Sequence, residues 1–179
     1  VAAEAGHSVV VSAPVSQQSA TGHRLTINES LMVTQRDLDP RYAAYAINGT
    51  PVDCVRIGRR LTDKPFDFCL SGINDGVNVG TDLFYSGTAA AAREAAMLYL
   101  PSMAISIATR ADEDMRVHLA EQVVGLFRLV AHVDKDRVQA GHDDSQNITG
   151  HIGPLPILNP TKRVPASACT LSLMRLAVA

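Results

Sequence analysis

Apolar and polar positions follow one another along this chain in the order of an α/β protein, with short strands followed by helices. Runs of about four to eight apolar or β-branched residues predict strands, at residues 8–13, 25–28, 31–34, 42–48, 66–70 and 102–108. Apolar positions at helical spacing predict helices, over residues 52–61, after Ser86 and over residues 112–133. The first five residues have the pattern of the last turn of a helix, which Gly6 would end.

The stretch from residue 69 to residue 100 has the order that brings an anion to the carboxyl end of a sheet. An apolar strand ends at Leu70, a loop rich in Gly, Asn and Asp follows, and Ser86, Gly87 and Thr88 open an alanine-rich helix. The amide hydrogens of a first helical turn have no partner within the helix, and the helix dipole favours negative charge there. We therefore expect a phosphate at residues 86–88, with an ordinary strand-to-helix connection as the alternative.

The loop inside this stretch is dense in side-chain oxygens, from Asn74, Asp75, Asn78 and Asp82. Oxygen ligands suit a hard divalent cation such as Mg²⁺ or Mn²⁺. The same residue types are also good loop formers, so both interpretations stay open. The glycines from Gly72 onward are spaced G-x-x-x-G-x-x-x-G, which is neither a dinucleotide fingerprint nor a P-loop, and no G-x-S-x-G elbow occurs.

A second polar loop, residues 15–23, follows the first predicted strand and belongs on the ligand side of a parallel sheet. Ser16, Ser19 and Thr21 offer hydroxyl groups there, although each is also an ordinary turn former.

The faces of the predicted helices indicate which positions are buried. Before helix 52–61, Thr50 is the expected N-cap and Pro51 takes the first position, where its missing N–H costs nothing. Arg56, Arg59 and Arg60 fall on the outward face, either as a solvated face or as a phosphate clamp. The inward positions of this helix and of helix 112–133 are Cys54, Val55, Ile57, Met115, Leu119, Val123, Leu126 and Val130.

Composition narrows the function classes. With 179 residues, 46% of them hydrophobic, the chain can bury a sizeable core, and a net charge of −2 without a basic stripe argues against nucleic acid as the main partner. No apolar run approaches the roughly 18 residues of a membrane span. The three cysteines, Cys54, Cys69 and Cys169, form no C-x-x-C pair, so neither a zinc site nor a disulfide framework is expected, and a cytoplasmic setting fits best.

The two ends of the chain depart from this regular order. Because a helix cannot be nucleated from a single turn, we expect the start of the chain to be incomplete, with an isolated tail as the alternative. After residue 133 the periodic signal fades, and residues 150–165 hold four prolines. We expect one domain over residues 1–133 and a divergent segment over 134–179, in which residues 169–179 form either a strand or a short helix.

Three blocks of sequence go beyond generic patterns. They read A-P-V-S-Q-Q-S-A-T-G-H-R-L-T from Ala13, N-G-T-P-V-D-C-V from Asn48 and S-G-I-N-D-G-V-N-V-G-T-D-L-F-Y-S-G-T from Ser71. Together they resemble the signature of the SurE family, the survival-protein-E nucleotidases. The resemblance implies a Rossmann-like three-layer α/β fold with a mainly parallel sheet. It also implies a divalent-metal-dependent phosphatase (Mg²⁺ or Mn²⁺) that acts on nucleoside 5′- and 3′-monophosphates as a homodimer or homotetramer.

The resemblance also suggests roles for individual residues. It implies metal ligation by Ser19 and Asn74, together with an Asp-Asp pair that belongs to an N-D-D-G string on the first strand of the family. The residues that it places at the phosphate are Ser86, Gly87 and Thr88, and those near the substrate are Gly49, Thr50, Asp53, Asn78 and Tyr85. No general acid or base is assigned, and none of the six histidines is positioned to be argued for that role.

The departures from the family pattern set a second group of expectations. The N-D-D-G string is not found, and the pair Asp143-Asp144 lies in a polar loop with no preceding strand. Since two carboxylates hold a divalent cation far better than uncharged oxygens, we expect weak metal binding and impaired activity. The alternatives are a non-catalytic nucleotide- or phosphate-binding module and a fragment with no stable fold. The family's N-V-P string is represented at best by Asn159-Pro160.

Overall fold

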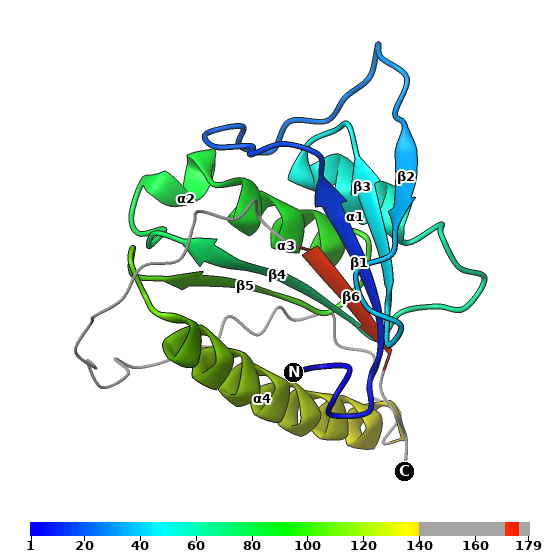
Figure 1. The fold of residues 1–179 in the computed structure, drawn as a ribbon. Helices are drawn as coiled ribbons and strands as arrows, with labels where there is room; N and C mark the ends of the chain where they lie inside the picture. The colour runs from blue at the N-terminus through cyan, green and yellow to red at the C-terminus, as the bar shows by residue number, and fades with distance from the viewer. Residues whose placement is uncertain (140–170, 176–179) are drawn as a thin grey trace.

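The computed structural model describes residues 1–139 and 171–175, which form a six-stranded sheet covered by helices (Figure 1). The strands, in the sheet order β2-β3-β1-β6-β4-β5, are β2 (Val33–Arg36), β3 (Ala43–Ile47), β1 (Ser8–Pro14), β6 (Leu171–Arg175), β4 (Phe68–Asp75) and β5 (Ser102–Ile107). The helices are α1 (Pro51–Gly58), α2 (Asp82–Tyr85), α3 (Gly87–Met97) and α4 (Glu113–Gln139).

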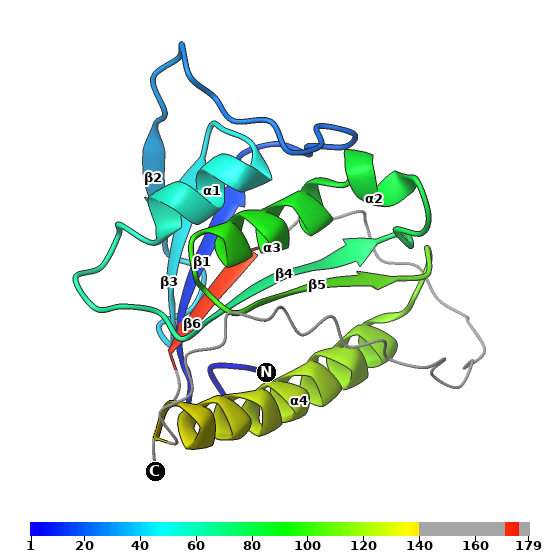
Figure 2. The same ribbon diagram turned by 180° about the vertical axis from the view of Figure 1, so that it is seen from behind.

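The sheet is mainly parallel. β1 pairs in parallel with β3, and β4 with β5, whereas β6 runs antiparallel to both β1 and β4, and β2 antiparallel to β3. Four strands therefore share one direction, with β2 and β6 opposed. Helices α1 and α3 cover one face of the sheet and α4 crosses the other, as Figures 1 and 2 show from opposite sides. The expected three-layer α/β fold is confirmed.

Alternation along the strands divides the core between the two faces of the sheet. Val10 and Cys69 pack with the residues of α1 and α3, among them Cys54, Val55, Ala91 and Ala95. Their neighbours Val9 and Phe68 point to the opposite face, where they pack with Phe127 of α4. The expected inward positions Cys54, Val55 and Val123 are buried, and Phe127 is a buried residue of α4 outside the predicted stripe.

The start of α1 follows the sequence prediction closely. Thr50 is the N-cap and Pro51 the first helical residue, and Thr50 and Asp53 form a capping box. This arrangement satisfies two backbone N–H groups that have no partner within the helix.

Several predicted elements differ from the structure in type, position or extent, among them α4, which continues to Gln139 instead of ending near residue 133. Residues 25–28 form no strand, because the N–H and hydroxyl of Thr26 donate to the carboxylate of Asp53 instead of to a neighbouring strand. The strand expected to end at Leu70 continues to Asp75, since Ser71 lies between paired residues of β5 and β6. The short helix α2 was not predicted, and β2 lies two residues later than expected.

Residues 169–179 were expected to form either a strand or a short helix, and the structure has a strand there, β6. β6 lies in the middle of the sheet, with Ser8 opposite Arg175 in β1 and Phe68 opposite Met174 in β4. The expectations for Asp143-Asp144, Asn159-Pro160 and Cys169 fall outside the described residues, as do those for the side chain of Val130.

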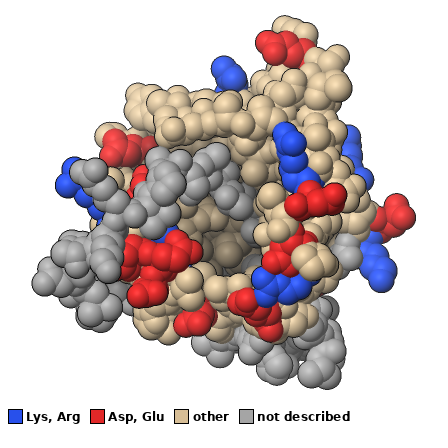
Figure 3. Space-filling view, in the orientation of Figure 1, with Lys and Arg blue, Asp and Glu red and all other residues tan. Residues whose placement is uncertain are grey.

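The described surface carries charges of both signs. Acidic and basic side chains are interspersed over the described part of the face drawn in Figure 3, without a continuous basic stretch. Among residues 1–139 and 171–175, no helix is both long and apolar enough to cross a membrane.

Candidate phosphate site at the start of α3

The site begins at the end of β4, where the strand is bent by a bulge. The pairing with β5 shifts register between Ser71 and Asn74, and Gly72 has a φ of 122°. A Cβ added to Gly72 would lie 2.4 Å from the carbonyl oxygen of Ile105, so no other residue fits this approach of the two strands. Bulges bend a strand and redirect its side chains, and this one immediately precedes Asn74.

Asn74 lies against the first turn of α3. The hydroxyl of Thr88 donates to Asn74 Oδ1 at 3.3 Å, and Asn74 Nδ2 donates to the carbonyl oxygen of Gly76 at 2.7 Å. Thr88 is 2% exposed and Asn74 is half-buried, so this contact is partly buried. A residue with an expected metal-ligand role and one with an expected phosphate role are thus brought together.

Ser86 begins α3 as its N-cap. Its Oγ accepts a hydrogen bond from the N–H of Ala89 at 3.1 Å, and its own backbone is extended while Gly87 and Thr88 are helical. The preceding short helix, α2, closes on the same residue through a bond from the Ser86 N–H to the carbonyl of Asp82 at 2.9 Å. Two helices therefore meet at Ser86, and the first-turn amides of α3 lie at the carboxyl end of β4 (Figure 2).

The loop of residues 15–23, which follows β1, packs against the start of α3. The N–H of Gly22 donates to the carbonyl oxygen of Tyr85 at 2.9 Å. A Cβ added to Gly87 would lie 3.3 Å from both the carbonyl oxygen of Gln18 and the hydroxyl of Thr21. Ser19 of this loop is exposed, and its Oγ accepts from Gln17 Nε2 at 3.0 Å.

Two further residues expected near the substrate also border this region. Asn78 Nδ2 donates to the hydroxyl of Ser106 at 2.7 Å, which ties the loop after β4 to β5. The side chain of Tyr85 is 64% exposed, while its backbone carbonyl receives the bond from Gly22.

Gly49, Thr50 and Asp53 form a separate group that supports a neighbouring loop. Asp53 is 1% exposed, and its carboxylate accepts from the N–H of Thr26 at 3.0 Å, the hydroxyl of Thr26 at 2.7 Å and the N–H of Thr50 at 2.8 Å. Thr50 also donates from Oγ1 to the carbonyl oxygen of Arg24 at 2.6 Å. These bonds hold residues 24–26 in place. The side chains of Thr50 and Asp53 therefore point into the protein and fix this segment.

A hollow of about 490 Å³ lies beside the loop that packs against the start of α3. It lies between the loop after β1, the segment held by Asp53 and the turn from β3 to α1. Gln18 lines this hollow, and its carbonyl oxygen is the atom that would meet a Cβ on Gly87. Gln18 therefore borders both the hollow and the start of α3. The residues that line it are Val15, Ser16, Gln18, Arg24, Leu25, Thr26, Ile27, Asn28, Glu29, Asn48 and Gly49.

The donors at this edge of the sheet do not by themselves fit a divalent cation. Ser19 and Asn74 supply uncharged oxygens, and the nearby carboxylate of Asp75 is paired with Arg116 at 3.1 Å. Within the described residues, no group of three or more His, Cys, Asp or Glu side chains could hold a metal ion. Hard cations such as Mg²⁺ and Mn²⁺ bind to several oxygen ligands at once, and at least one or two of these are usually carboxylates.

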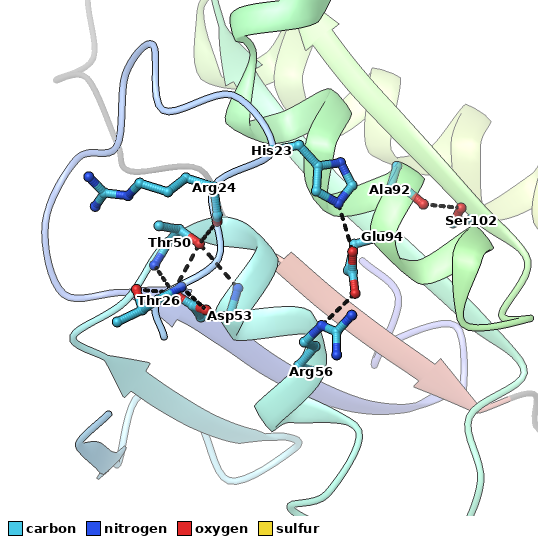
Figure 4. A network of polar contacts seen from close by, with 9 residues as sticks. All are labelled: His23, Arg24, Thr26, Thr50, Asp53, Arg56, Ala92, Glu94 and Ser102. Atoms are coloured by element: carbon cyan, nitrogen blue, oxygen red, sulfur yellow. Dashed lines mark hydrogen bonds and ion pairs between the residues drawn. The ribbon is translucent and has the colours of Figure 1, made fainter. Parts of the chain in front are cut away.

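A buried polar network beside the site escaped the sequence analysis (Figure 4). Glu94 of α3 is 2% exposed, His23 Nε2 donates to its Oε2 at 2.7 Å, and Arg56 Nε of α1 lies 2.6 Å from its Oε1. The spacing of Glu94 in α3 could have indicated its burial. Glu94 lies four positions after Ala90 and three after Ala91, so it shares the helix face of these two buried residues. Arg56 is therefore paired with Glu94 while about half of its side chain stays exposed.

The sequence of this chain also matches a known protein family. The sequence model of the family described as "Survival protein SurE" matches residues 1–150. The chain belongs to the SurE family.

Relatives within the SurE family extend this result. The chain is 47% identical over 114 residues to a protein of Syntrophus aciditrophicus named 5′-nucleotidase SurE, a match that covers 62% of this chain and 43% of the relative. It is 52% identical over 105 residues to the Desulfovibrio desulfuricans protein of the same name, which covers 58% and 40%. The crystal structure of the SurE protein from Aquifex aeolicus, at 37% identity, matches with a TM-score of 0.54 over 66% of this chain and 47% of that one. The chain thus spans less than half of the length of these three relatives.

Proposed function

We propose that this chain forms the substrate-binding part of a nucleotidase that hydrolyses nucleoside 5′- and 3′-monophosphates to nucleoside and phosphate. The observation that carries the proposal is the hydrogen bond from Thr88 to Asn74, which joins the first turn of α3 to the end of β4. A phosphate at this point meets helix-terminal amides and the positive end of the helix dipole. The relatives named 5′-nucleotidase SurE support the same reaction class.

In this proposal the phosphate group lies at Ser86–Thr88 and the nucleoside in the adjoining hollow. Backbone amides at the start of α3 stabilise the equatorial oxygens of the phosphate as water attacks phosphorus and the bond to the nucleoside oxygen breaks. The leaving oxygen takes up a proton, so that nucleoside and inorganic phosphate are the products. At about 490 Å³ the hollow is within the size range of small-molecule sites, roughly 300–1,000 Å³.

The cation is a separate element of the proposal. The motif resemblance seen in the sequence implies a divalent metal ion, Mg²⁺ or Mn²⁺, and in this chain Ser19 and Asn74 are the residues that would contribute to its site. Because both are uncharged, we propose that the 179-residue polypeptide binds the ion weakly and turns over substrate slowly. A cytoplasmic setting and a homodimer or homotetramer belong to the same proposal, and no nucleic acid is expected as main partner.

The experiment combines a binding measurement with an activity measurement on the 179-residue chain. Binding of AMP is followed by calorimetry, and phosphate release from AMP and from 3′-AMP is followed with and without Mn²⁺. We expect AMP binding that Asn74→Ala weakens, together with slow, Mn²⁺-dependent release. The matched control is Gln35→Ala, which removes an exposed amide side chain from β2, outside both the hollow and the start of α3. Full activity without added metal would contradict the cation part, and absence of AMP binding would contradict the whole proposal.

A second candidate function is supported by the same donor set. A site with helix amides but uncharged metal donors suits a nucleotide- or phosphate-binding module that performs no chemistry. The outcome that favours it is metal-independent binding of AMP with no phosphate release on prolonged incubation with Mn²⁺.

A further inference from the structure

The network around Glu94 suggests a role for a residue that nothing so far assigns to the site. A carboxylate that is 2% exposed is costly unless it is paired. Glu94 has two partners, and they come from different elements: His23 from the end of the loop after β1, and Arg56 from α1 (Figure 4). The two contacts therefore have different structural consequences.

The contact with Arg56 joins two helices that are already packed together. Cys54 and Val55 of α1 and Ala91 and Ala95 of α3 belong to one buried cluster, so α1 and α3 remain in contact without the ion pair. Arg56 is also 47% exposed, and a partly solvated pair contributes modestly to stability.

The contact with His23 joins α3 to a loop whose other anchors among the described residues lie mainly at its two ends. The Val15 N–H donates to the carbonyl oxygen of Ile47 at 2.9 Å, and residues 24–26 are held by Thr50 and Asp53. Residues 15–17, 19 and 20 of this loop are exposed. A hydrogen bond joins the loop to the end of α2, just before α3, from the Gly22 N–H to the carbonyl oxygen of Tyr85. Gln18 and Thr21 also lie close to Gly87, the first residue of α3. His23 adjoins Gly22, so its side chain holds the loop directly beside those contacts.

We propose that His23 is a positioning residue, which through buried Glu94 holds the loop of residues 15–23 against the phosphate-binding start of α3. It places Ser19 and Gln18 beside the site without touching the ligand. The bond does not require a charged ring, since Nε2 of a neutral imidazole also donates when it carries the proton. A glutamine can replace such a donor, whereas a phenylalanine of similar size cannot. The consequence for ligand binding rests on the proposed function, but the position of the loop does not.

The experiment compares hydrogen exchange in the full 179-residue chain for the wild type, His23→Phe, His23→Gln and Arg56→Gln. Since a hydrogen bond to a charged group contributes about 1.5–3 kcal/mol, His23→Phe should speed exchange in residues 15–24 by about tenfold or more. His23→Gln should remain within about twofold of the wild type. Arg56→Gln, which removes the other partner of Glu94, should leave exchange in the loop unchanged.

A second readout connects the loop to the ligand. Inorganic phosphate should bind about tenfold more weakly to His23→Phe than to the wild type, and His23→Gln should restore the affinity. Equal loop exchange in the wild type and His23→Phe would overturn the proposal, and so would Arg56→Gln if it loosened the loop as much. If His23→Phe lowers the folded fraction, Glu94→Gln supplies the same comparison, with a smaller rise of about threefold expected in the loop. If the wild type binds no phosphate, the proposed function fails while the exchange measurement still decides the role of His23.

Discussion

At the scale of single residues, the site depends on side chains that fix loops as much as on those that face a ligand. Asp53 shows this, because the carboxylate of a residue expected near the substrate is buried and accepts hydrogen bonds from Thr26 and from the N–H of Thr50. The N-cap role of Thr50 was predictable from local sequence, since it requires only neighbouring residues. The bonds between Asp53 and Thr26 were not, because the two residues are 27 positions apart and no local pattern joins them.

Replacing Asp53 should therefore cost stability first. Asp53→Ala leaves the N–H groups of Thr26 and Thr50 without their acceptor and removes the capping box, so we expect a loss of about 2–4 kcal/mol in the free energy of unfolding. Urea denaturation measures this loss. Asp63→Ala, at an exposed position, is the matched control and should change stability by less than about 0.5 kcal/mol. Unchanged stability with lost AMP binding would instead give Asp53 a direct role at the substrate.

The same scale explains why His23 and Glu94 were missed. The sequence places a histidine in a polar loop and a glutamate in an alanine-rich helix 71 positions later, and either could be solvated. Their pairing follows from the packing of the loop on α3, which is a tertiary property. The burial of Glu94 could have been suspected from its spacing to Ala90 and Ala91, but its partners could not.

At the scale of elements, the strands and helices with strong apolar patterns were predictable, and those with polar sequences were not. β1 and β5 are formed by apolar runs, and both occur where expected. The second half of β4, from Ser71 to Asp75, is polar and rich in loop formers, yet it pairs with β5 beyond a bulge. Pairing with an existing neighbour overrides local preference here, because strand propensity depends on context.

Gly87 lies where α1, α3 and the loop after β1 approach one another closely, so a larger residue there should destabilise the protein. A Cβ there would lie 2.9 Å from Pro51 Cγ and 3.3 Å from the Gln18 carbonyl oxygen, so Gly87→Ala must push these elements apart. We expect a loss of about 1–3 kcal/mol in the free energy of unfolding and weaker phosphate binding. Gly125→Ala in α4 is the matched control, because nothing lies within 4 Å of its added Cβ, and a gain of up to about 1 kcal/mol is expected. Equal effects of the two substitutions in chemical denaturation would refute the close packing at Gly87.

The turn before β3 makes a prediction about pH. Hydrogen bonds from the Arg41 side chain and backbone lower the pKa of Asp39 from its usual 3.8 to about 2. A carboxyl group whose pKa is lowered by folding contributes stability above its unfolded pKa and loses it as the pH falls through the folded value. The stability difference between the wild type and Asp39→Asn should thus be constant above about pH 5 and shrink toward pH 2. Urea midpoints measured from pH 7 to pH 3 test this, and a difference that grows on acidification would contradict it.

At the scale of the whole molecule, residues from near the carboxyl end complete the centre of the sheet. β6 is bordered on one side by β1 and on the other by β4, so these two strands meet each other only through it. The sequence left residues 169–179 open between strand and helix, because a short run of mostly apolar and small residues suits either. The separate segment predicted from residue 134 onward was inferred from composition. Within it, residues 171–175 pair with β1 and β4 and so belong to the sheet.

Removing β6 should therefore affect the entire fold. A chain that ends at residue 170 leaves facing backbone groups of β1 and β4 without partners, and we expect it to lose its cooperative thermal transition. Circular dichroism during heating measures this, with the 179-residue chain as the reference. A variant that ends at residue 175 keeps β6 and should unfold like the full chain. If the chain ending at residue 170 unfolds at the same temperature as the full one, β6 contributes little to the sheet.

The central claim is that a phosphate binds at the start of α3, beside Asn74 and under the loop after β1. Titration of the isotope-labelled 179-residue chain with inorganic phosphate, followed by amide chemical shifts, tests it most directly. The largest shifts are predicted at Ser86–Ala89, with smaller ones at Asn74–Gly76 and in residues 18–22, and Asn74→Ala should reduce them. Shifts confined to the exposed arginines of α1 and its end, Arg59 and Arg60, or no shifts at all, would contradict the account.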